Sequence, residues 1–560
     1  MKHSLLRLSI LALLLAINKV VFAAHEINGI NYNIYENQGR AEVTSKNPRY
    51  SGDIVIPSEI EYKGSLYRVT DIDETAFDDC HGLKSLDIPP TITNISCHFY
   101  DCEQLNKVNI HDIGAWCKIV YGYYPYNRPQ YNPLYFAHNL YLDNELINEI
   151  QIPEGIEVLQ SCAFIGCTNL LSLKLPNSLT IINSQAFKDC TNLASVSIPN
   201  SVLNIYDEAF YGCHNLKQVE LCDGDKYLTC DDDIFGQCPI QKVYLGRDMG
   251  TDIFKSHNEI KEVIIGRTVT KVYSFNLCEG IHTLTIPKNV RILNGFHGCS
   301  GLKHLILEDG DELLEMGSMF ADNKHIETIH LGRNLEYIVT NYQPAPFRSN
   351  KALENLTIGE CVTELGESLF RGCQKLKDFR IPNSVVNIGY DCFDDCISLQ
   401  SVVIPNSVKT IGCGAFQCCK KLKTVTIGKN VTDIGSGAFD SGDVDDYNIG
   451  SLTRIISLIE KPFEVLHIFR YWTPINQGSR NMIQANDTLF VPKGTVHLYK
   501  STPYWNDVKY IMEIEESTDI IDISNSTQKD NSASYNLNGI VETKPRKGIY
   551  IKNGKKVIIK

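Results

Sequence analysis

The sequence predicts a repeat solenoid: about sixteen stacked units of roughly 23 residues, a curved parallel β-sheet on one face, terminal caps and a small C-terminal β tail. Three observations predict it. A Phe-x-x-Cys motif recurs along the chain, a short alternating strand pattern follows most copies, and each unit is too small to bury its own apolar face. Stacking buries those faces in a continuous core, so the units form one cooperative object.

The Phe-x-x-Cys motif marks the start of each unit. It occurs at Phe77/Cys80, Phe99/Cys102, Phe164/Cys167, Phe187/Cys190, Phe210/Cys213, Phe235/Cys238, Phe275/Cys278, Phe296/Cys299, Phe370/Cys373, Phe393/Cys396 and Phe416/Cys419. Degenerate copies carry His or Asn in place of Cys, at Phe136/Asn139, Phe254/His257, Phe320/Asn323 and Phe347/Asn350. Phe439 starts a last partial copy.

Each unit contains one short strand and a return segment. In the unit at Phe393, apolar residues recur with period two at Val402 and Ile404, which is typical of a short strand. Pro405 ends the strand, because proline cannot donate a hydrogen bond to a sheet. Val408 and Ile411 then supply a second apolar pair on the return side.

The complete pattern, C-x-x-L-x-x-V-x-I-P-x-x-V-x-x-I-x-x-x-A-F, resembles the BspA-like class of leucine-rich repeats. The resemblance covers residues 69–451, with departures at 113–135, which is rich in Tyr, and at 223–250, which is acidic. Members of this class resemble bacterial surface proteins that attach to host matrix proteins or to other microbes. The resemblance therefore implies a leucine-rich-repeat solenoid that works by binding.

The two ends predict export and capping. Residues 1–23 are typical of a signal peptide, with Lys2 and Arg7 before a short apolar run. That run is too short for a permanent membrane-spanning helix. Residues 24–68 and 452–516 resemble the N- and C-terminal capping segments of the family, which close the open ends of a solenoid.

A separate tail follows a polar linker. Residues 517–534 are rich in Ser, Asn, Asp and Thr, and 535–560 contain two apolar strands, 549–551 and 557–559, around an Asn-Gly hairpin signal. The tail resembles the C-terminal sorting tails of the type IX secretion pathway. The alternative is a small closing hairpin, and the basic charge of the tail could also favour an anionic surface.

The cysteines are predicted to be buried free thiols. Units stacked about 4.8 Å apart hold equivalent Cβ atoms farther apart than a disulfide prefers. Stacked single thiols also do not form a tetrahedral metal cage. Local pairing remains an alternative for Cys97/Cys102, Cys162/Cys167 and Cys413/Cys418.

Charge and motifs exclude several functions. The net charge of −13 argues against nucleic-acid partners. No later stretch is long and apolar enough for a transmembrane segment. We find no nucleophile elbow, zinc-protease motif, phosphate loop or dinucleotide fingerprint, so we expect no enzyme, no catalytic residue and no cofactor. The acidic runs 231–233 and 443–446 could bind calcium, but they lack the spacing of a calcium loop, and we expect solvated loops.

The Tyr-rich departure admits two interpretations. Its rings could form a recognition loop, since Tyr is favoured at interfaces, or they could cover a defective pair of repeats. The aromatic residues are Trp116, Tyr121, Tyr123, Tyr124, Tyr126, Tyr131 and Tyr135.

The candidate binding face is the outward row of the strands. Inward Val and Ile alternate with one outward position, the tenth after each Phe, or the ninth in the unit at Phe235, which is one residue short. That row contains Asp87, Asn109, Lys174, Ser197, Glu220, Tyr244, Ile264, Thr285, Ile306, His330, Thr357, Arg380, Val403 and Thr426. Its middle holds the candidate partner-binding residues Tyr244, Ile264, Ile306 and His330, with His304 in the adjacent row. Clustered apolar groups on one face suggest an interaction site, although Ile is also a good strand former.

The sequence thus predicts a secreted or surface-displayed protein that binds proteins, such as host extracellular matrix or bacterial surface proteins, and possibly itself. One alternative is a structural, self-associating surface element without a foreign ligand. Another is glycan capture, which only the Tyr-rich stretch suggests.

Overall fold

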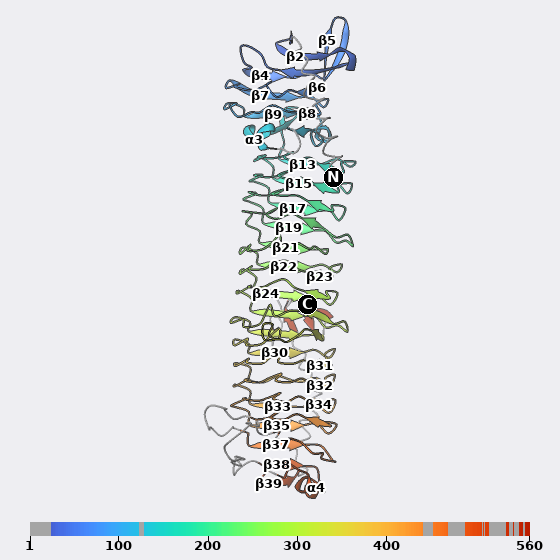
Figure 1. The fold of residues 1–560 in the computed structure, drawn as a ribbon, viewed down its shortest axis with the longest axis vertical. Coiled ribbons are helices and arrows are strands. Elements are labelled where there is room, and N and C mark those ends of the chain that lie inside the picture. Colours follow the sequence, from blue (N-terminus) through green and yellow to red (C-terminus); the bar gives the residue numbers. More distant parts are fainter. Residues whose placement is uncertain are drawn as a thin grey trace, which may run out of the picture. The chain divides into compact units, whose positions relative to one another are not determined.

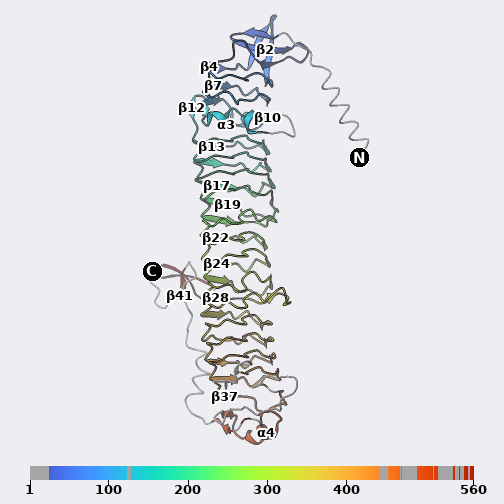
Figure 2. The same cartoon turned by 60° about the vertical axis from the view of Figure 1, so that its left-hand side comes forward.

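The computed structural model describes residues 24–122, 128–440, 452–466, 468, 488–506, 508, 510–514, 534–536, 541–542, 548–552 and 555–559. The signal-type segment 1–23, the acidic run 443–446 and most of the linker lie outside them. The chain forms two compact units, one of residues 1–217 and 230–238 and the other of residues 218–229 and 239–560. Within each unit, short strands stack one above another (Figures 1 and 2).

The first unit begins with antiparallel strands. β1 (His25–Ile27), β2 (Ile30–Tyr35) and β3 (Arg40–Thr44) form a meander, and β5 (Glu59–Tyr62) pairs antiparallel with β6 (Ser65–Ile72). β3 pairs parallel with β6, which starts the parallel stacking of the coils that follow.

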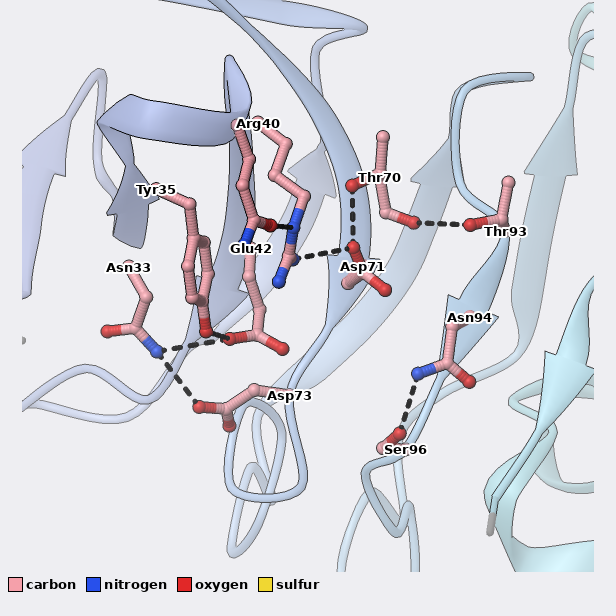
Figure 3. A network of polar contacts seen from close by, with 11 residues as sticks. Asn33, Tyr35, Arg40, Glu42, Thr70, Asp71, Asp73, Thr93, Asn94 and Ser96 are labelled. Atoms are coloured by element: carbon pink, nitrogen blue, oxygen red, sulfur yellow. Dashed lines mark hydrogen bonds and ion pairs between the residues drawn. The ribbon is translucent and has the colours of Figure 1, made fainter. Parts of the chain in front are cut away.

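A polar network ties these first strands together (Figure 3). Glu42 accepts hydrogen bonds from the Tyr35 hydroxyl at 2.8 Å and from Asn33 at 3.4 Å, and burial raises the pKa of its carboxyl. Arg40 forms an ion pair of 3.0 Å with Asp71 on β6. These contacts link β2, β3 and β6 through outward side chains, which alternate with the buried Tyr32 and Ile34 along β2.

The remaining elements of the first unit are short. They are β4 (Gly52–Val55), β7 (Leu83–Ile88), β8 (Asn94–Ile95), β9 (Lys107–Ile110), β10 (Val120–Tyr121), β11 (Leu140–Leu142), β12 (Glu145–Leu146), β13 (Glu149–Gln151), β14 (Val158–Leu159), β15 (Ser172–Lys174), β16 (Ile181–Ile182), β17 (Ser195–Ile198) and β18 (Asn204–Ile205), with helices η1 (Glu36–Gln38), α2 (Ile113–Trp116), η2 (Pro129–Tyr131) and α3 (Leu134–Ala137). β20 (Thr229–Cys230) contains one of the three points where the chain passes between the two units.

The second unit repeats the same coil. Its strands are β19 (Gln218–Leu221), β21 (Lys242–Leu245), β22 (Glu262–Ile265), β23 (Lys271–Val272), β24 (Thr283–Ile286), β25 (Ile292–Leu293), β26 (His304–Leu307), β27 (Leu314–Met316), β28 (Thr328–Leu331), β29 (Leu335–Glu336), β30 (Asn355–Ile358), β31 (Glu364–Leu365), β32 (Asn387–Ile388), β33 (Ser401–Val403), β34 (Thr410–Ile411), β35 (Thr424–Ile427), β36 (Asp433–Ile434), β37 (Arg454–Ser457), β38 (Thr488–Val491) and β39 (Tyr510–Glu513), with α4 (Val496–Ser501).

Most coils contribute strands to two parallel sheets, but residues 377–381, where the repeat predicts a strand with Arg380 outward, form no strand. The predicted strand forms one of them: β33 pairs in parallel with β35, with Val402 opposite Val425. The return segment forms a second ladder of two-residue strands, in which Ile388 of β32 lies opposite Ile411 of β34. The parallel solenoid predicted from the repeats is therefore confirmed, and the second ladder is an addition to it.

The phenylalanines of the repeat form buried columns. In the first unit Phe164, Phe187 and Phe210 stack with ring centroids 5.4 and 5.1 Å apart. In the second unit Phe393 and Phe416 stack at 5.2 Å. All five rings are fully buried. The period of the sequence therefore becomes a continuous aromatic core.

The cysteines of the repeat have a defined hydrogen-bonding role. The thiol of Cys190 donates to the carbonyl oxygen of Phe164 in the preceding coil at 3.2 Å, and Cys419 donates to Phe393 at 3.3 Å. Asn350, which replaces Cys in a degenerate copy, donates from Nδ2 to Phe320 at 3.0 Å. All twenty cysteines lie in the described residues and none is in a disulfide.

The tail forms an antiparallel sheet of its own. Its strands are β40 (Ser534–Asn536), β41 (Val541–Glu542), β42 (Gly548–Lys552) and β43 (Lys555–Ile559), in the order β41-β40-β42-β43. β42 and β43 pair on either side of Asn553-Gly554, with Ile549 opposite Ile558. This pairing confirms the predicted hairpin strands.

Candidate protein-binding face

The strands of the second unit present the candidate residues on one side of a sheet. In β21, β26 and β28 buried positions alternate with half-buried ones, and in β22 they alternate with exposed ones. Inward residues such as Val243 and Leu305 are fully buried. The alternation places all five candidate residues on the outward side, as the period of two requires.

Tyr244 and Ile264 form the first group. They are partners in the parallel register of β21 and β22, and Ile264 is 38% exposed. The Tyr244 hydroxyl donates a hydrogen bond of 2.8 Å to Asp223. Partial burial and then this carboxylate raise the pKa of Tyr244 to about 12. The ring is thereby fixed beside an exposed aliphatic side chain.

His304, Ile306 and His330 form the second group. Ile306 of β26 lies opposite His330 of β28, and His304 lies opposite Thr328, whose hydroxyl is 3.0 Å from its Nδ1. Burial lowers the pKa of His304. His330 Nε2 lies 3.1 Å from a carboxylate oxygen of Asp309. These contacts hold both imidazoles at the sheet surface.

β24 separates the two groups. Its outward residue Thr285 lies opposite Ile306 on β26, and both are half-buried. The five candidate residues therefore make two small clusters on one sheet side. Their surroundings are polar, with Glu262 exposed and forming an ion pair with Lys242 at 2.9 Å.

Two members of the predicted outward row are buried, so the prediction is wrong for them. Asn109 donates to Asp87 at 2.7 Å and accepts from the backbone of Asn144, in the turn between β11 and β12, which covers it. Thr426 lies in register with Ile456 of β37, itself buried. Alternation fixes the side of the sheet, but neighbouring loops and coils decide the exposure.

The Tyr-rich stretch divides between core and surface. Trp116 is buried, donates to the Ala163 carbonyl at 2.8 Å and packs edge-on against buried Tyr121. These two rings cover the irregular coils, which was one of the two interpretations. Tyr131 and Tyr135 are half-buried, while Tyr123, Tyr124 and Tyr126 lie outside the described residues.

Phe136 does not belong to the buried Phe column, contrary to the assignment of Phe136/Asn139 as a repeat motif. Leu134 of α3 is fully buried, whereas Phe136 is half-buried and contacts Tyr100, which is exposed. The sequence alone did not identify Tyr100 and His98 as parts of this aromatic surface. Their only signal was their proximity to the break in the period.

The described residues offer no metal centre: nowhere among them do three or more His, Cys, Asp or Glu side chains gather in a geometry suited to a metal ion. Asp231, Asp232 and Asp233 lie in this part of the chain, whereas the run 443–446 does not. The same residues contain no helix with the length and apolar character needed to cross a membrane.

The coils stack so that one side of a parallel sheet faces outward and the repeated Phe and Cys residues fill the core. This arrangement defines a leucine-rich-repeat solenoid, a class of repeat protein that generally binds other proteins. The family model described as "BspA type Leucine rich repeat region (6 copies)" matches residues 58–117, 136–261, 247–343 and 340–459. The chain belongs to the family of BspA-type leucine-rich-repeat proteins. Proteins of this family are typically secreted or found at the surface. No curated protein matches the chain.

Several solved structures are similar to this chain. A leucine-rich repeat protein from Bacteroides ovatus is 19% identical, with 77% of this chain and 94% of that chain covered and a TM-score of 0.35. A leucine rich cell surface protein from Faecalibacterium prausnitzii is 19% identical, with 78% and 94% covered and a TM-score of 0.26. The pneumococcal vaccine antigen PcpA is 16% identical, with 88% and 99% covered and a TM-score of 0.27.

Proposed function

We propose that this protein is exported, displayed at the cell surface, and binds a protein partner through the outward side chains of β21, β22, β26 and β28. The partner is a host extracellular matrix protein or a protein on another cell. Leucine-rich-repeat solenoids are typically not enzymes, and the chain carries no known catalytic motif.

The exposed Ile264 beside the fixed Tyr244 ring carries this proposal. An aliphatic side chain on a sheet surface loses about 25 cal/mol for each Å² of apolar area left in water. A partner that covers it recovers this free energy. Aromatic anchors held in place by a hydrogen bond lose little entropy on binding, and such residues tend to dominate binding energy.

The test is the triple variant Tyr244→Ser, Ile264→Ser, Ile306→Ser in the full chain. A control changes three exposed apolar residues outside β21, β22, β26 and β28, Val403→Ser, Leu171→Ser and Leu146→Ser. Both variants must first keep the melting temperature of the wild type. We expect the first variant to lose at least tenfold in affinity for immobilised matrix proteins or cells, because each buried anchor contributes about 2 kcal/mol.

Two results would contradict the proposal. Full binding by the triple variant would exclude this face as the main site. Light scattering that rises with concentration for the wild type, and not for the triple variant, would identify the partner as a second copy of this chain, which is the structural alternative.

A further inference from the structure

A strip of aromatic side chains lies on the surface of the first unit, where the sequence departs from the repeat. The ring centroids of Tyr100 and Phe136 are 6.2 Å apart, and those of Phe136 and Tyr135 are 5.1 Å apart. Tyr100 is 59% exposed, and the other two rings are half-buried. Unlike the buried Phe column, these rings offer apolar faces and edges to a ligand.

The strip continues into an open groove. Tyr135 and Phe136 of α3 line a cavity of about 410 Å³ together with Thr168, Asp189 and Thr191. This volume lies in the range of small-molecule sites, which combine aromatic walls with a few polar groups. In Figure 1, α3, which carries Tyr135 and Phe136, lies at the left edge of the first unit.

The polar residues of the groove come from successive coils. Thr168 follows Cys167, and Thr191 follows Cys190, so the two hydroxyl groups occupy the same place in neighbouring turns. Among the described residues, neither the Asp189 carboxylate nor the Thr191 hydroxyl makes a side-chain hydrogen bond. The Asp189 carboxylate lies against Gly212, where a Cβ would come within 2.2 Å of Oδ1. These groups are therefore positioned and still able to bond a ligand.

We propose that this groove binds a neutral saccharide. A pyranose ring has an apolar C–H face that packs on aromatic rings and a rim of hydroxyl groups that donate to a carboxylate and exchange hydrogen bonds with threonine hydroxyls. The strip supplies the aromatic surface, and Asp189 and Thr191 supply the acceptor and the hydroxyl. The site is separate from the sheet side of β21–β28 and does not depend on the function proposed for it.

The ring geometry favours a saccharide over a quaternary ammonium ion. Cation-binding aromatic cages need several ring faces that converge on one point. Here Tyr135 and Phe136 meet at 85° and Tyr100 and Phe136 at 74°, so each contact joins an edge to a face and leaves no space for a cation between two ring faces. A strip fits an extended chain of sugar rings better than a point charge.

The test uses the full chain on an array of neutral, sialylated and sulfated oligosaccharides, followed by saturation-transfer NMR with the neutral saccharides retained. We expect neutral saccharides to be retained and choline chloride not to displace them. The double variant Tyr100→Ala, Tyr135→Ala should bind about tenfold more weakly, from the loss of two ring contacts. Asp189→Asn tests the carboxylate separately and should also weaken binding.

Tyr206→Ala is the matched control, because Tyr206 is an exposed tyrosine of the same unit outside the groove. It should bind as the wild type does. The proposal is overturned if no neutral saccharide is retained above the level of the heat-denatured chain, if choline or a peptide binds in its place, or if both groove variants keep full affinity at an unchanged melting temperature.

Discussion

The Tyr244 hydroxyl donates a 2.8 Å hydrogen bond to Asp223, a residue of the loop that follows the preceding strand. The same relationship recurs farther along the chain, where His330 Nε2 lies 3.1 Å from Asp309. The two acids occupy equivalent places in the sequences LCDGD and LEDGD, and the two partners in YLGR and HLGR. The candidate face is thus built from two copies of one arrangement.

In each copy, the backbone of a glycine also lies close to the carboxylate. Gly266 lies where a Cβ would be 2.5 Å from Asp223 Oδ1, and a Cβ on Gly359 would be 2.1 Å from Asp309 Oδ1. Only glycine leaves room for the carboxylate at these positions. Tyr244 and His330 are therefore held by the same arrangement of an acidic residue and a glycine, which occurs twice in the chain.

The buried arginine of the second copy should be a major source of stability. Arg333 is fully buried and donates to the carbonyls of Pro287, Lys288 and Val290 at 3.0, 2.9 and 2.7 Å, two coils away. Burial lowers the pKa of its guanidinium to about 10. We expect Arg333→Met to reduce the free energy of unfolding by roughly 3 kcal/mol, because three carbonyls lose their donors.

Arg267→Met is the control for this prediction. Arg267 also follows an Ile/Leu-Gly pair but is exposed, so its replacement should change stability by less than about 0.5 kcal/mol. Both variants are measured by urea denaturation. Equal effects of the two substitutions would show that the buried hydrogen bonds contribute nothing.

The repeat cysteines should be reduced and slow to react in the folded protein. Burial raises the pKa of the Cys190 thiol well above its ordinary value, and that of Cys167 to about 12. The thiolate is the reactive form, so alkylation at pH 8 should modify exposed Cys413 first. Denaturation without reductant should then release the six thiols Cys167, Cys190, Cys213, Cys373, Cys396 and Cys419.

Mass spectrometry of the alkylated peptides measures this outcome. Cys413 serves as the internal control for reagent activity. If most of the six remain unlabelled after denaturation without reductant, they are in disulfides, and the free-thiol interpretation is wrong.

His111 should make the first unit more stable in mild acid. Its Nδ1 lies 2.6 Å from Asp143 and its Nε2 2.8 Å from Asp87, and these hydrogen bonds, that of Asp143 first, raise the pKa of the imidazole. A pKa raised on folding stabilises the protein fully below the unfolded value, near 6.5. This contribution disappears as pH rises through the folded pKa.

The measurement compares the wild type with His111→Gln, which cannot take up the charge. Between pH 5.5 and pH 8.5, about one unit below and two above the ordinary pKa, the wild type should lose more thermal stability than the variant. If the wild type and the variant lose the same thermal stability across this range, His111 is not the group whose titration changes the stability.

Periodicity was enough to predict most of the main strands and both core columns, although residues 377–381 of the regular coil at Phe370 form no strand. It did not predict the second ladder, because a two-residue strand such as Thr410–Ile411 has no alternation to detect. Exposure depended on tertiary contacts. Asn109 is covered by a hairpin that the repeat pattern does not contain, and Phe136 leaves the core where Leu134 takes the buried place.

For the candidate face too, the sequence predicted which side chains point outward but not the tertiary contacts that hold them. Alternation identified Tyr244 and Ile264 as outward, but not the loop acid that fixes Tyr244, because Asp223 belongs to another coil and an irregular segment. The groove beside α3 had only an indirect signal, a break in the period rich in aromatic residues. Side-chain groups brought together by several coils are set by stacking, which no single unit encodes.

The tail should be dispensable for folding and required for display. In the described residues β40 pairs with β41 and β42, and β42 with β43, so the four tail strands form a sheet with one another. Deleting 535–560 should therefore leave the melting temperature unchanged. If the tail is a sorting signal, as its resemblance implies, the truncated protein should be absent from the surface of a source cell that has the matching pathway. Labelling of intact cells measures display, and replacing the linker 517–533 with a Gly/Ser segment of equal length is the control that keeps the tail. If the truncated protein is labelled at the surface as strongly as the full chain, the tail is a closing hairpin and not a sorting signal.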